Sequence, residues 1–269
     1  MSGAAAFGRE RAVAGEIASE AGLVLQQHYR SSGQERIEVK GLARDLVTEA
    51  DRASETVILD RLRREFPGDA IVSEESSPER RTKGRVWFVD PLDGTVNFAH
   101  GVPVFSVSIG LAVDGDPVAG VVHAPLLRET FSAARGEGVT LNGAPIHVSG
   151  QAELSRALLA TGFPYRRNEV RENNLDNFQR MALASRGVRR FGSAAVDLAW
   201  VAAGRFDGFW ELWLSPWDTC AGICLVREAG GVVTEIPEGG DVLYGGTLVA
   251  ANAALRGILA KSVTGLPKG

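Results

Sequence analysis

The sequence has few of the side chains that cross-link a fold or bind soft metal ions. Its 269 residues include only two cysteines and four histidines. Two cysteines exclude a disulfide framework. Cys220 and Cys224 are four positions apart, so we expect them on one face of a helix as small buried residues. None of the histidines lies at ligand spacing from another histidine or cysteine, which argues against a zinc site.

Long apolar runs and an excess of positive charge are also missing. No run reaches the roughly 18–20 residues that a membrane span needs, and the N-terminus lacks the pattern of a signal peptide. Lys and Arg number 29 against 33 Asp and Glu, a net charge of −4, which argues against a broad nucleic-acid surface. We therefore expect a cytoplasmic protein with no membrane and no nucleic-acid partner.

Several common catalytic motifs are absent as well. The sequence contains no Gly-x-Ser-x-Gly, no His-Glu-x-x-His, no phosphate-binding Gly-x-x-x-x-Gly-Lys-Ser/Thr and no Gly-x-Gly-x-x-Gly. By contrast, glycine is abundant, at 32 residues against an average usage of about 7%. This surplus predicts many tight turns or close approaches of the backbone.

Hydrophobic periodicity and turn signals predict a mixed α and β fold with a change of character near residue 149. The first part, residues 1–149, reads as an α+β unit, with helices at 9–30 and 49–66 and a short strand at 37–40. Its remaining strands form a mostly antiparallel meander at 70–73, 86–89, 104–113, 117–123 and 129–134, followed by an Asn142-Gly143 hairpin. The second part, residues 150–269, alternates strands at 158–161, 188–191, 206–211, 232–235 and 248–251 with helices at 169–185, 193–203, 218–229 and after Asn252.

Carboxylates at the ends of these elements are the candidate metal ligands. Glu74 and Glu75 follow a short strand, Asp90 ends an apolar strand, Asp93 comes three residues later, and Asp218 lies at the start of a helix. Mg²⁺ is usually held by a few carboxylates together with substrate phosphate oxygens. With so little His and Cys, oxygen ligation is the consistent choice.

The segment from Asp90 to Thr95 is the most informative. Pro91 fixes one backbone angle, so two carboxylates three residues apart can converge on neighbouring metal ions. Gly94 allows the backbone to approach a ligand closely, and the amides of Gly94 and Thr95 could face a phosphate, as amides at a helix start do.

With these features the sequence resembles the inositol monophosphatase family, within the lithium-sensitive, magnesium-dependent phosphatase superfamily. The resemblance spans residues 45–231 and depends on motifs in the family's order: Asp45-Leu-Val-Thr-Glu-Ala-Asp51, Ser73-Glu-Glu-Ser76, Trp87-Phe-Val-Asp-Pro-Leu-Asp-Gly-Thr-Val-Asn-Phe98, Gly192-Ser-Ala-Ala195, and Pro216-Trp-Asp-Thr-Cys-Ala-Gly222 with Glu228-Ala-Gly-Gly231. It implies a layered αβαβα sandwich with the active site between the two parts.

The resemblance also implies a set of metal ligands for two or three Mg²⁺ ions. Glu74, Asp90 and the backbone carbonyl of Leu92 would hold the first ion. Asp90, Asp93 and Asp218 would hold the second, with Asp90 bridging, and Glu74 could face a third, weaker ion.

Further roles follow from the same resemblance. Thr95 and Asp51 would activate the attacking water, and Glu75 would orient water ligands. Gly94 and Thr95 would cradle the phosphate. The wall that touches the alcohol is expected to contain Gly192, Ser193, Ala194 and Glu211.

The implied activity is Mg²⁺-dependent hydrolysis of a small phosphate monoester, with inositol 1-phosphate as the first choice. Histidinol phosphate, fructose 1,6-bisphosphate, NADP or a 3′-phosphoadenosine nucleotide are alternatives with the same chemistry. An alternative of another class is a non-catalytic regulatory or binding protein on the same scaffold. The family further implies inhibition by lithium and a homodimer.

Some residues have simpler interpretations. Thr48-x-x-Asp51 is a capping-box spacing, so Asp51 could also fix the start of its helix. Asp197, on a helix of small apolar residues, is expected to be a hydrogen-bonded structural acid. Arg166, next to Arg167, is expected in solvent, with a substrate-facing role as the alternative. Three more residues stay open: Lys40 as a strand-end charge or a residue near the metal loop, and Trp213 and Ser215 as positions that border the alcohol pocket.

Overall fold

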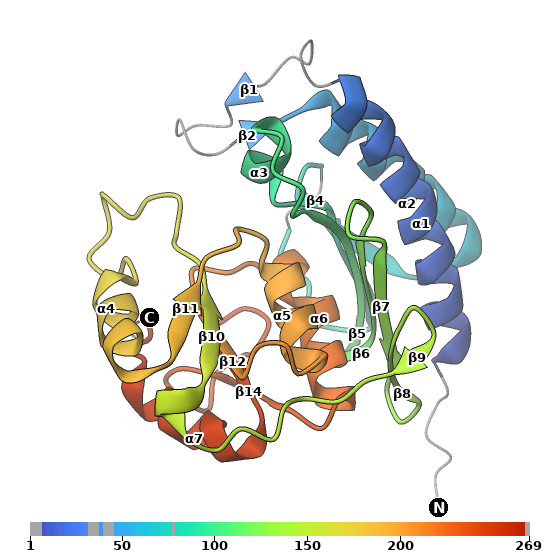
Figure 1. Ribbon diagram of the computed structural model, residues 1–269. Helices are drawn as coiled ribbons and strands as arrows, with labels where there is room; N and C mark the ends of the chain where they lie inside the picture. Colours follow the sequence, from blue (N-terminus) through green and yellow to red (C-terminus); the bar gives the residue numbers. More distant parts are fainter. Residues whose placement is uncertain (1–6, 32–37, 40–45, 77–78, 267–269) are drawn as a thin grey trace, which may run out of the picture.

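The computed structural model describes residues 7–31, 38–39, 46–76 and 79–266. Two sheets and the helices around them form five layers (Figure 1). Helices α1 (Gly8–Ser31) and α2 (Glu49–Glu65) cover one face of the first sheet, and α5 (Ala194–Ala202) and α6 (Pro216–Glu228) lie between the two sheets. Helices α4 (Leu175–Ala184) and α7 (Ala253–Ser262) cover the outer face of the second sheet. The expected αβαβα sandwich is confirmed.

The first sheet is the meander expected from the sequence. It has the order β3-β4-β5-β6-β7-β8-β9, and its strands are β3 (Ala70–Ser73), β4 (Arg85–Asp93), β5 (Ser106–Val113), β6 (Asp116–Ala124), β7 (Glu129–Ala134), β8 (Gly138–Leu141) and β9 (Ala144–Pro145). All neighbours are antiparallel except β3 and β4, which are parallel. Asn142 and Gly143 form the hairpin turn between β8 and β9, both with positive φ.

The second sheet has the order β11-β10-β12-β14-β13. Its strands are β10 (Leu158–Thr161), β11 (Gly187–Arg189), β12 (Gly208–Leu212), β13 (Val232–Glu235) and β14 (Thr247–Ala251). β10 is parallel to β11 and β12, whereas β14 is antiparallel to β12 and β13. Two short strands, β1 (Glu38–Val39) and β2 (Leu46–Val47), pair separately, and a 3₁₀ turn at Leu154–Arg156 precedes β10.

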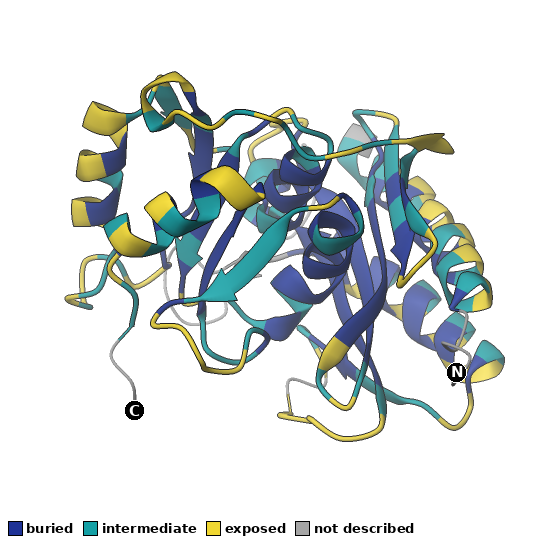
Figure 2. Ribbon diagram, turned by 90° about the horizontal axis from the view of Figure 1, so that it is seen from below, coloured by how far each residue is buried: buried dark blue, intermediate teal, exposed yellow. Residues whose placement is uncertain are grey.

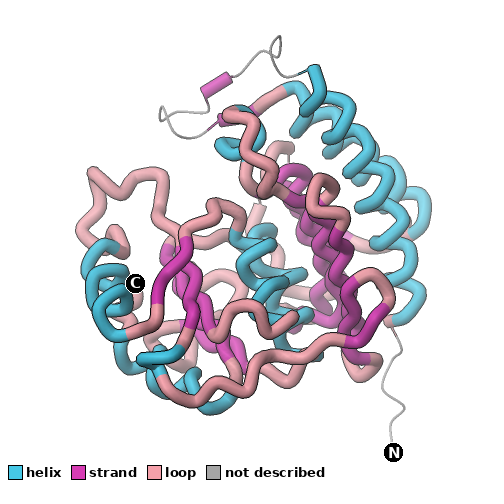
Figure 3. Tube along the Cα trace, viewed as in Figure 1, coloured by secondary structure: helices cyan, strands magenta, loops and turns pink. Residues whose placement is uncertain are grey.

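Two sequence predictions were wrong in detail. The helix expected from residue 169 begins only at Leu175, and Figure 3 shows a loop between β10 and α4. The reason is Asn174, whose φ of 72° is left-handed and whose side chain donates to Thr161 and accepts from the Trp210 indole. A short helix that the sequence did not suggest, α3 (Thr95–Ala99), directly follows β4.

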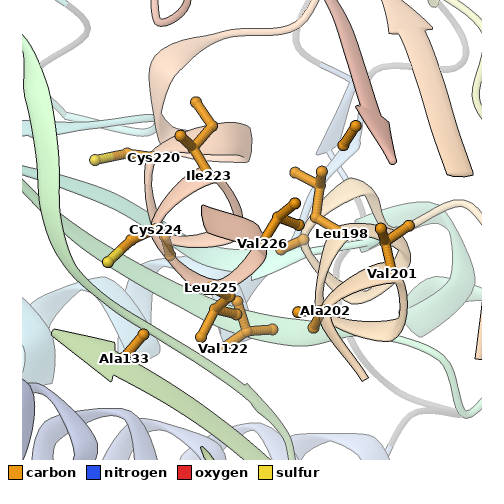
Figure 4. Close-up of a cluster of buried hydrophobic side chains, with 14 of the residues drawn as sticks. Val122, Ala133, Leu198, Val201, Ala202, Cys220, Ile223, Cys224, Leu225 and Val226 are labelled. Atoms are coloured by element: carbon orange, nitrogen blue, oxygen red, sulfur yellow. The ribbon is translucent and has the colours of Figure 1, made fainter. Parts of the chain in front are cut away.

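Helices α5 and α6 pack against each other, and α6 packs against the first sheet. Figure 4 shows Leu198 and Val201 of α5 beside Val226 of α6, with Val122 of β6 below. Cys220 and Cys224 are free and buried on one face of α6, as expected. Figure 2 shows these inner elements as buried and the outer helices as exposed on one side.

The largest hydrophobic cluster contains residues from both parts of the chain, such as Phe88 and Val122 together with Leu198 and Cys220. A boundary at residue 149 stays a prediction. Within the described residues, no helix combines the length and the apolar character that crossing a bilayer requires.

Candidate active site

Asp90 and Asp93 lie at the end of β4, which continues through Pro91 farther than the sequence suggested. The register between β4 and β5 shifts between these two acids, which marks an irregularity of the kind that re-aims side chains. The Ser54 hydroxyl of α2 donates to the Pro91 carbonyl at 2.8 Å and so holds the backbone between Asp90 and Asp93. Both carboxylates are buried, with exposures of 2% and 8%.

Glu74 follows β3, the parallel neighbour of β4, so both strands deliver acids to the same edge of the sheet. Its amide donates to the Val89 carbonyl at 3.2 Å. Behind it, the buried Glu55 of α2 accepts hydrogen bonds from the Ser73 hydroxyl and from the amide and hydroxyl of Ser76. This arrangement anchors the segment that carries Glu74.

Asp218 comes from the other half of the chain, in the first turn of α6. Its Oδ2 accepts the Ser215 amide at 2.7 Å, which completes a capping box. The helix begins at Pro216, so Asp218 is held in its first turn rather than opening it.

These four acids line one cavity of about 470 Å³ between the two sheets. The predicted residues Leu92, Gly94, Thr95, Gly192, Ser193, Ala194 and Glu211 line the same cavity. Glu75 and Asp51 are not among its lining residues, and Lys40 lies outside the described part of the chain. The structure therefore brings together nearly all of the predicted site.

The acids are close enough to disturb each other's ionisation. Burial, and then the charge of Glu74, raises the pKa of Asp90 and that of Asp218 well above the ordinary value for aspartate. Burial also raises the pKa of Asp93 to about 6, although hydrogen bonds from α5 oppose this shift. Positive charge close to these crowded carboxylates would favour their ionised forms.

The two oxygens of the Asp51 carboxylate contact Thr48 and Thr95. Its Oδ2 accepts the Thr48 amide at 2.8 Å and the Thr48 hydroxyl at 2.7 Å, which caps α2. Its Oδ1 lies 3.1 Å from the Thr95 hydroxyl, which also reaches the Leu92 carbonyl at 3.0 Å. The carboxylate is 1% exposed, so its orientation is fixed from both sides.

Part of the expected substrate wall both lines the cavity and is hydrogen-bonded to Asp93. The Ser193 hydroxyl and the amides of Ala194 and Ala195 donate to the Asp93 carboxylate. Asp93 therefore sits at the start of α5, where helix amides favour negative charge. Gly192 has a φ of 84° and precedes this helix start.

The cavity also contains a second group of charged residues. Glu211 of β12 and Asp197 of α5 line it together with the Arg190 side chain. Burial raises the pKa of Glu211 to about 8, while Arg190 opposes the shift. Asp197 is not the satisfied acid that the sequence suggested, because among the described residues its buried Oδ1 has no hydrogen-bond partner. Such an unpaired buried group costs about 1–3 kcal/mol.

Trp213 and Arg166 lie together on the lining of the cavity. Trp213 is 41% exposed, and its indole donates to the Glu172 carbonyl at 2.9 Å. The Arg166 guanidinium lies 5.5 Å from the centre of the Trp213 ring, so Arg166 lines the cavity and is not simply a solvated charge. Ser215 lines the same side.

The donor set fits hard divalent cations, because it consists of carboxylate and carbonyl oxygens around one cavity. In the described part of the chain, however, no three His, Cys, Asp or Glu side chains are arranged as a ready metal site. The Asp93 carboxylate is hydrogen-bonded to the start of α5. The fit is one of donor type and placement, not of a formed coordination shell.

Sequence reasoning missed several residues that shape the site. Ser54 and Glu55 share the buried stripe of α2 with Asp51 and Ile58, and a polar residue on a core-facing stripe was the available signal. Tyr165 lines the cavity; its loop position gave no signal.

Asn97 and Gly162 were also missed. The Asn97 amide donates to the carbonyls of Val104 and Phe191 at 2.7 Å each and ties α3 to the segment before Gly192. A Cβ on Gly162 would lie 2.0 Å from the Glu211 carboxylate, so only glycine leaves room for that acid. Both contacts are between distant segments, which local sequence patterns do not reveal.

Comparison with known proteins gives a consistent result. The sequence model of the inositol monophosphatase family matches residues 9–266. The inositol-1-monophosphatase of Synechocystis sp. is 44% identical over 256 residues, which cover 94% of this chain and 89% of that protein. The Nus factor SuhB of Pseudomonas aeruginosa is 47% identical over 217 residues, which cover 78% of this chain and 79% of that protein.

Among solved structures, the inositol monophosphatase of Anabaena (Nostoc) sp. has a TM-score of 0.85 and 42% identity, with 95% of each chain covered. The family match extends over nearly the whole chain and includes every element that carries an acid of the cavity. The chain belongs to the inositol monophosphatase family of phosphoric monoester hydrolases.

Proposed function

We propose that this enzyme hydrolyses inositol 1-phosphate with Mg²⁺ as its metal ion. The observation that carries the proposal is the convergence of Glu74, Asp90, Asp93 and Asp218, from two strand ends and a helix start, on one cavity. A site that crowds four carboxylates is suited to cations and to the phosphate they attract.

In this proposal Glu74, Asp90 and the Leu92 carbonyl hold the first ion. Asp90, Asp93 and Asp218 hold the second, and Glu74 also faces a third, weaker ion. When bound, such ions supply Lewis acidity: they lower the pKa of water and stabilise negative charge on the phosphate and leaving oxygens.

Thr95 and Asp51 are the residues that act on the attacking water. Thr48 fixes the Asp51 carboxylate, which faces the Thr95 hydroxyl. With its proton directed to Asp51, the Thr95 oxygen is free to accept a hydrogen bond from the attacking water and to orient it. Glu75, which lies outside the cavity lining, orients water ligands from behind.

Different residues of the cavity contact the phosphate and the alcohol of the substrate. Gly94 and Thr95 lie at the start of α3, where the first amides of a helix lack partners within it and can bind phosphate. Gly192, Ser193, Ala194 and Glu211 face the alcohol.

The choice of inositol 1-phosphate is supported by the name of the Synechocystis relative. The test is a comparison of kcat/KM for inositol 1-phosphate, histidinol phosphate, fructose 1,6-bisphosphate, NADP and 3′-phosphoadenosine 5′-phosphate. We expect inositol 1-phosphate to rank first by at least about tenfold, the contribution of one or two hydrogen bonds. A higher kcat/KM for any other member would replace it as the substrate.

A binding protein on the same scaffold is the second candidate, because the Pseudomonas relative is named a Nus factor. The two functions differ in their need for the acids. If binding is the only function, no phosphate is released from any member of the panel, and Asp90→Asn leaves the partner bound.

Family membership also supports inhibition by Li⁺ and a homodimer. Turnover that is unchanged at millimolar Li⁺ in saturating Mg²⁺ would argue against the first. Gel filtration at the monomer mass of 28.6 kDa would argue against the second.

A further inference from the structure

Asp197 has no structural role that accounts for its burial. It lies in the first turn of α5, is 1% exposed and lines the cavity. Within the described residues, its Oδ1 is buried and has no hydrogen-bond partner. An acid that only stabilised the fold would be expected to pair with another group.

Capping of α5 does not explain this acid either. The amides of Ala194 and Ala195 donate to Asp93, and the Val196 amide donates to the Ser193 hydroxyl. The amide of Asp197 itself donates to the Ser193 carbonyl. The first amides of the helix are thus in use, and the Asp197 carboxylate takes part in none of these bonds.

The surroundings of Asp197 are those of the alcohol end of the cavity. Its electrostatic neighbours are Glu211, Asp93 and Arg190, and burial and the two acids raise its pKa well above the ordinary value. Arg190 extends over Gly192, where a Cβ would lie 2.2 Å from its Nη1. Glu211 occupies the space that Gly162 leaves open. Two acids and a guanidinium therefore face the same region from three segments.

We propose that Asp197 is a second substrate-binding acid, which accepts a hydrogen bond from a hydroxyl of the substrate that does not carry the phosphate. This inference rests on the proposed function and deepens it. It identifies the substrate class as the phosphates of polyhydroxylated alcohols, whose hydroxyls can satisfy Asp197 and Glu211 together. An alcohol without further hydroxyls leaves Asp197 unpaired, and sites built to bind a hydroxyl discriminate strongly against such analogues.

The test compares two substrates that share the phosphate end and differ at the alcohol end. Inositol 1-phosphate has free hydroxyls, and p-nitrophenyl phosphate has none. Asp197→Leu keeps the approximate size of the side chain and removes its oxygens. We expect kcat/KM for inositol 1-phosphate to fall about tenfold or more, mostly through KM, while kcat/KM for p-nitrophenyl phosphate changes less than about twofold. Asp197→Asn, which keeps an acceptor oxygen, should retain most of the wild-type kcat/KM for inositol 1-phosphate.

The control is Val196→Ala, which changes a buried neighbour on α5 that does not line the cavity. It should lower the melting temperature and leave the ratio of the two kcat/KM values unchanged. Equal losses on both substrates in Asp197→Leu, or no loss on either, would overturn the proposal. If Asp197→Leu does not fold, Asp197→Asn carries the same comparison, with a smaller loss confined to inositol 1-phosphate.

Binding separates this proposal from the proposed function. Calorimetric titration of inositol 1-phosphate in Ca²⁺, without turnover, should give weaker binding to Asp197→Leu than to wild type. If wild type releases no phosphate from any substrate but binds inositol 1-phosphate through Asp197, the hydrolytic function fails and this proposal stands. If binding is absent, or is unaffected by the variant, this proposal fails.

Discussion

At the scale of single residues, the two oxygens of the Asp51 carboxylate have different partners, and this division makes a sharp prediction. Oδ2 must accept, because the Thr48 amide points at it. In Asp51→Asn the amide oxygen must therefore take that position, and its NH₂ group faces the Thr95 hydroxyl. Thr95 can then no longer donate to residue 51.

We expect Asp51→Asn to lower kcat at least about 100-fold, the usual contribution of a group that handles the attacking proton. Steady-state kinetics on inositol 1-phosphate measure this loss. Thr48→Ser, which keeps the capping hydroxyl, is the control and should retain nearly full activity. A wild-type kcat in Asp51→Asn would remove Asp51 from the mechanism.

His123 of β6 links burial to the pH dependence of stability. Its Nδ1 lies 2.9 Å from the Thr130 hydroxyl, and burial lowers its pKa below 6.5 in the folded state. Between the folded and unfolded pKa values the unfolded chain binds more protons, so stability falls as the pH drops below about 6.5.

We expect the free energy of unfolding to decrease from pH 7 to pH 5 by less in His123→Gln than in wild type. The difference is at most about 1.4 kcal/mol per pH unit, and urea unfolding at both pH values measures it. The exposed His147, replaced by Gln, controls for the loss of a histidine as such. Identical slopes for wild type and His123→Gln would contradict this account.

At the scale of elements, α2 serves as the support of the site. Three polar residues on its core-facing stripe hold three separate segments: Asp51 contacts Thr95, Ser54 holds Pro91, and Glu55 holds Ser73 and Ser76. Groups that orient metal ligands from behind affect metal affinity strongly.

Glu55→Ala releases the segment that carries Glu74, so the Mg²⁺ concentration for half-maximal activity should rise about tenfold or more. Activity measured across a Mg²⁺ titration gives this value. Thr56→Ala, a neighbouring change at an exposed position whose hydroxyl bonds only within the helix, should leave the titration unchanged. An unchanged titration in Glu55→Ala would show that α2 does not support the site.

Helix α6, which contains Asp218, packs closely against two glycines of the first sheet. Gly110 of β5 and Gly120 of β6 are direct cross-strand partners. A Cβ on either residue would lie 2.6 Å from backbone atoms of Ala221. Real Cβ atoms do not approach backbone that closely, so larger residues here must displace the helix.

We expect Gly120→Ala to lower stability by about 1–3 kcal/mol and to reduce kcat/KM, because α6 moves Asp218 away from the other acids. Thermal unfolding and kinetics measure both effects. Gly15→Ala is the matched control, since nothing lies within 4 Å of its Cβ position in α1, and it should stabilise the protein by about 0.5–1 kcal/mol. Full activity in Gly120→Ala would show that the close packing of α6 on these glycines does not position Asp218.

The sequence predicted elements well where local signals decide them. The cap at Thr48 placed the start of α2, and the Asn142-Gly143 turn placed the last hairpin. It failed where distant contacts decide. Asn174 delays α4 because its side chain is bonded into β10 and β12, and no local pattern contains that information.

The same distinction applies to the site. The acids could be predicted because they follow strand ends or start a helix and belong to recognisable motifs. Asp197 could not, since a single acid on a helix of small residues looks the same whether its partner is protein or ligand. Only the absence of a partner for its Oδ1 among the described residues separates the two.

At the scale of the whole molecule, the five layers bring the site together. The first sheet supplies Glu74, Asp90 and Asp93, and α6, packed between the sheets, supplies Asp218. The second sheet supplies Glu211 to the same cavity. Hydrolysis at such a site depends on cations, because the acids that define it repel each other without them.

The most direct test is phosphate release from inositol 1-phosphate in Mg²⁺, in EDTA, and in Mg²⁺ with Asp90→Asn. We expect turnover in Mg²⁺, loss of at least about 100-fold in EDTA, and a comparable loss in Asp90→Asn with circular dichroism unchanged. Equal turnover in Mg²⁺ and in EDTA would contradict the central claim that these carboxylates act by holding metal ions.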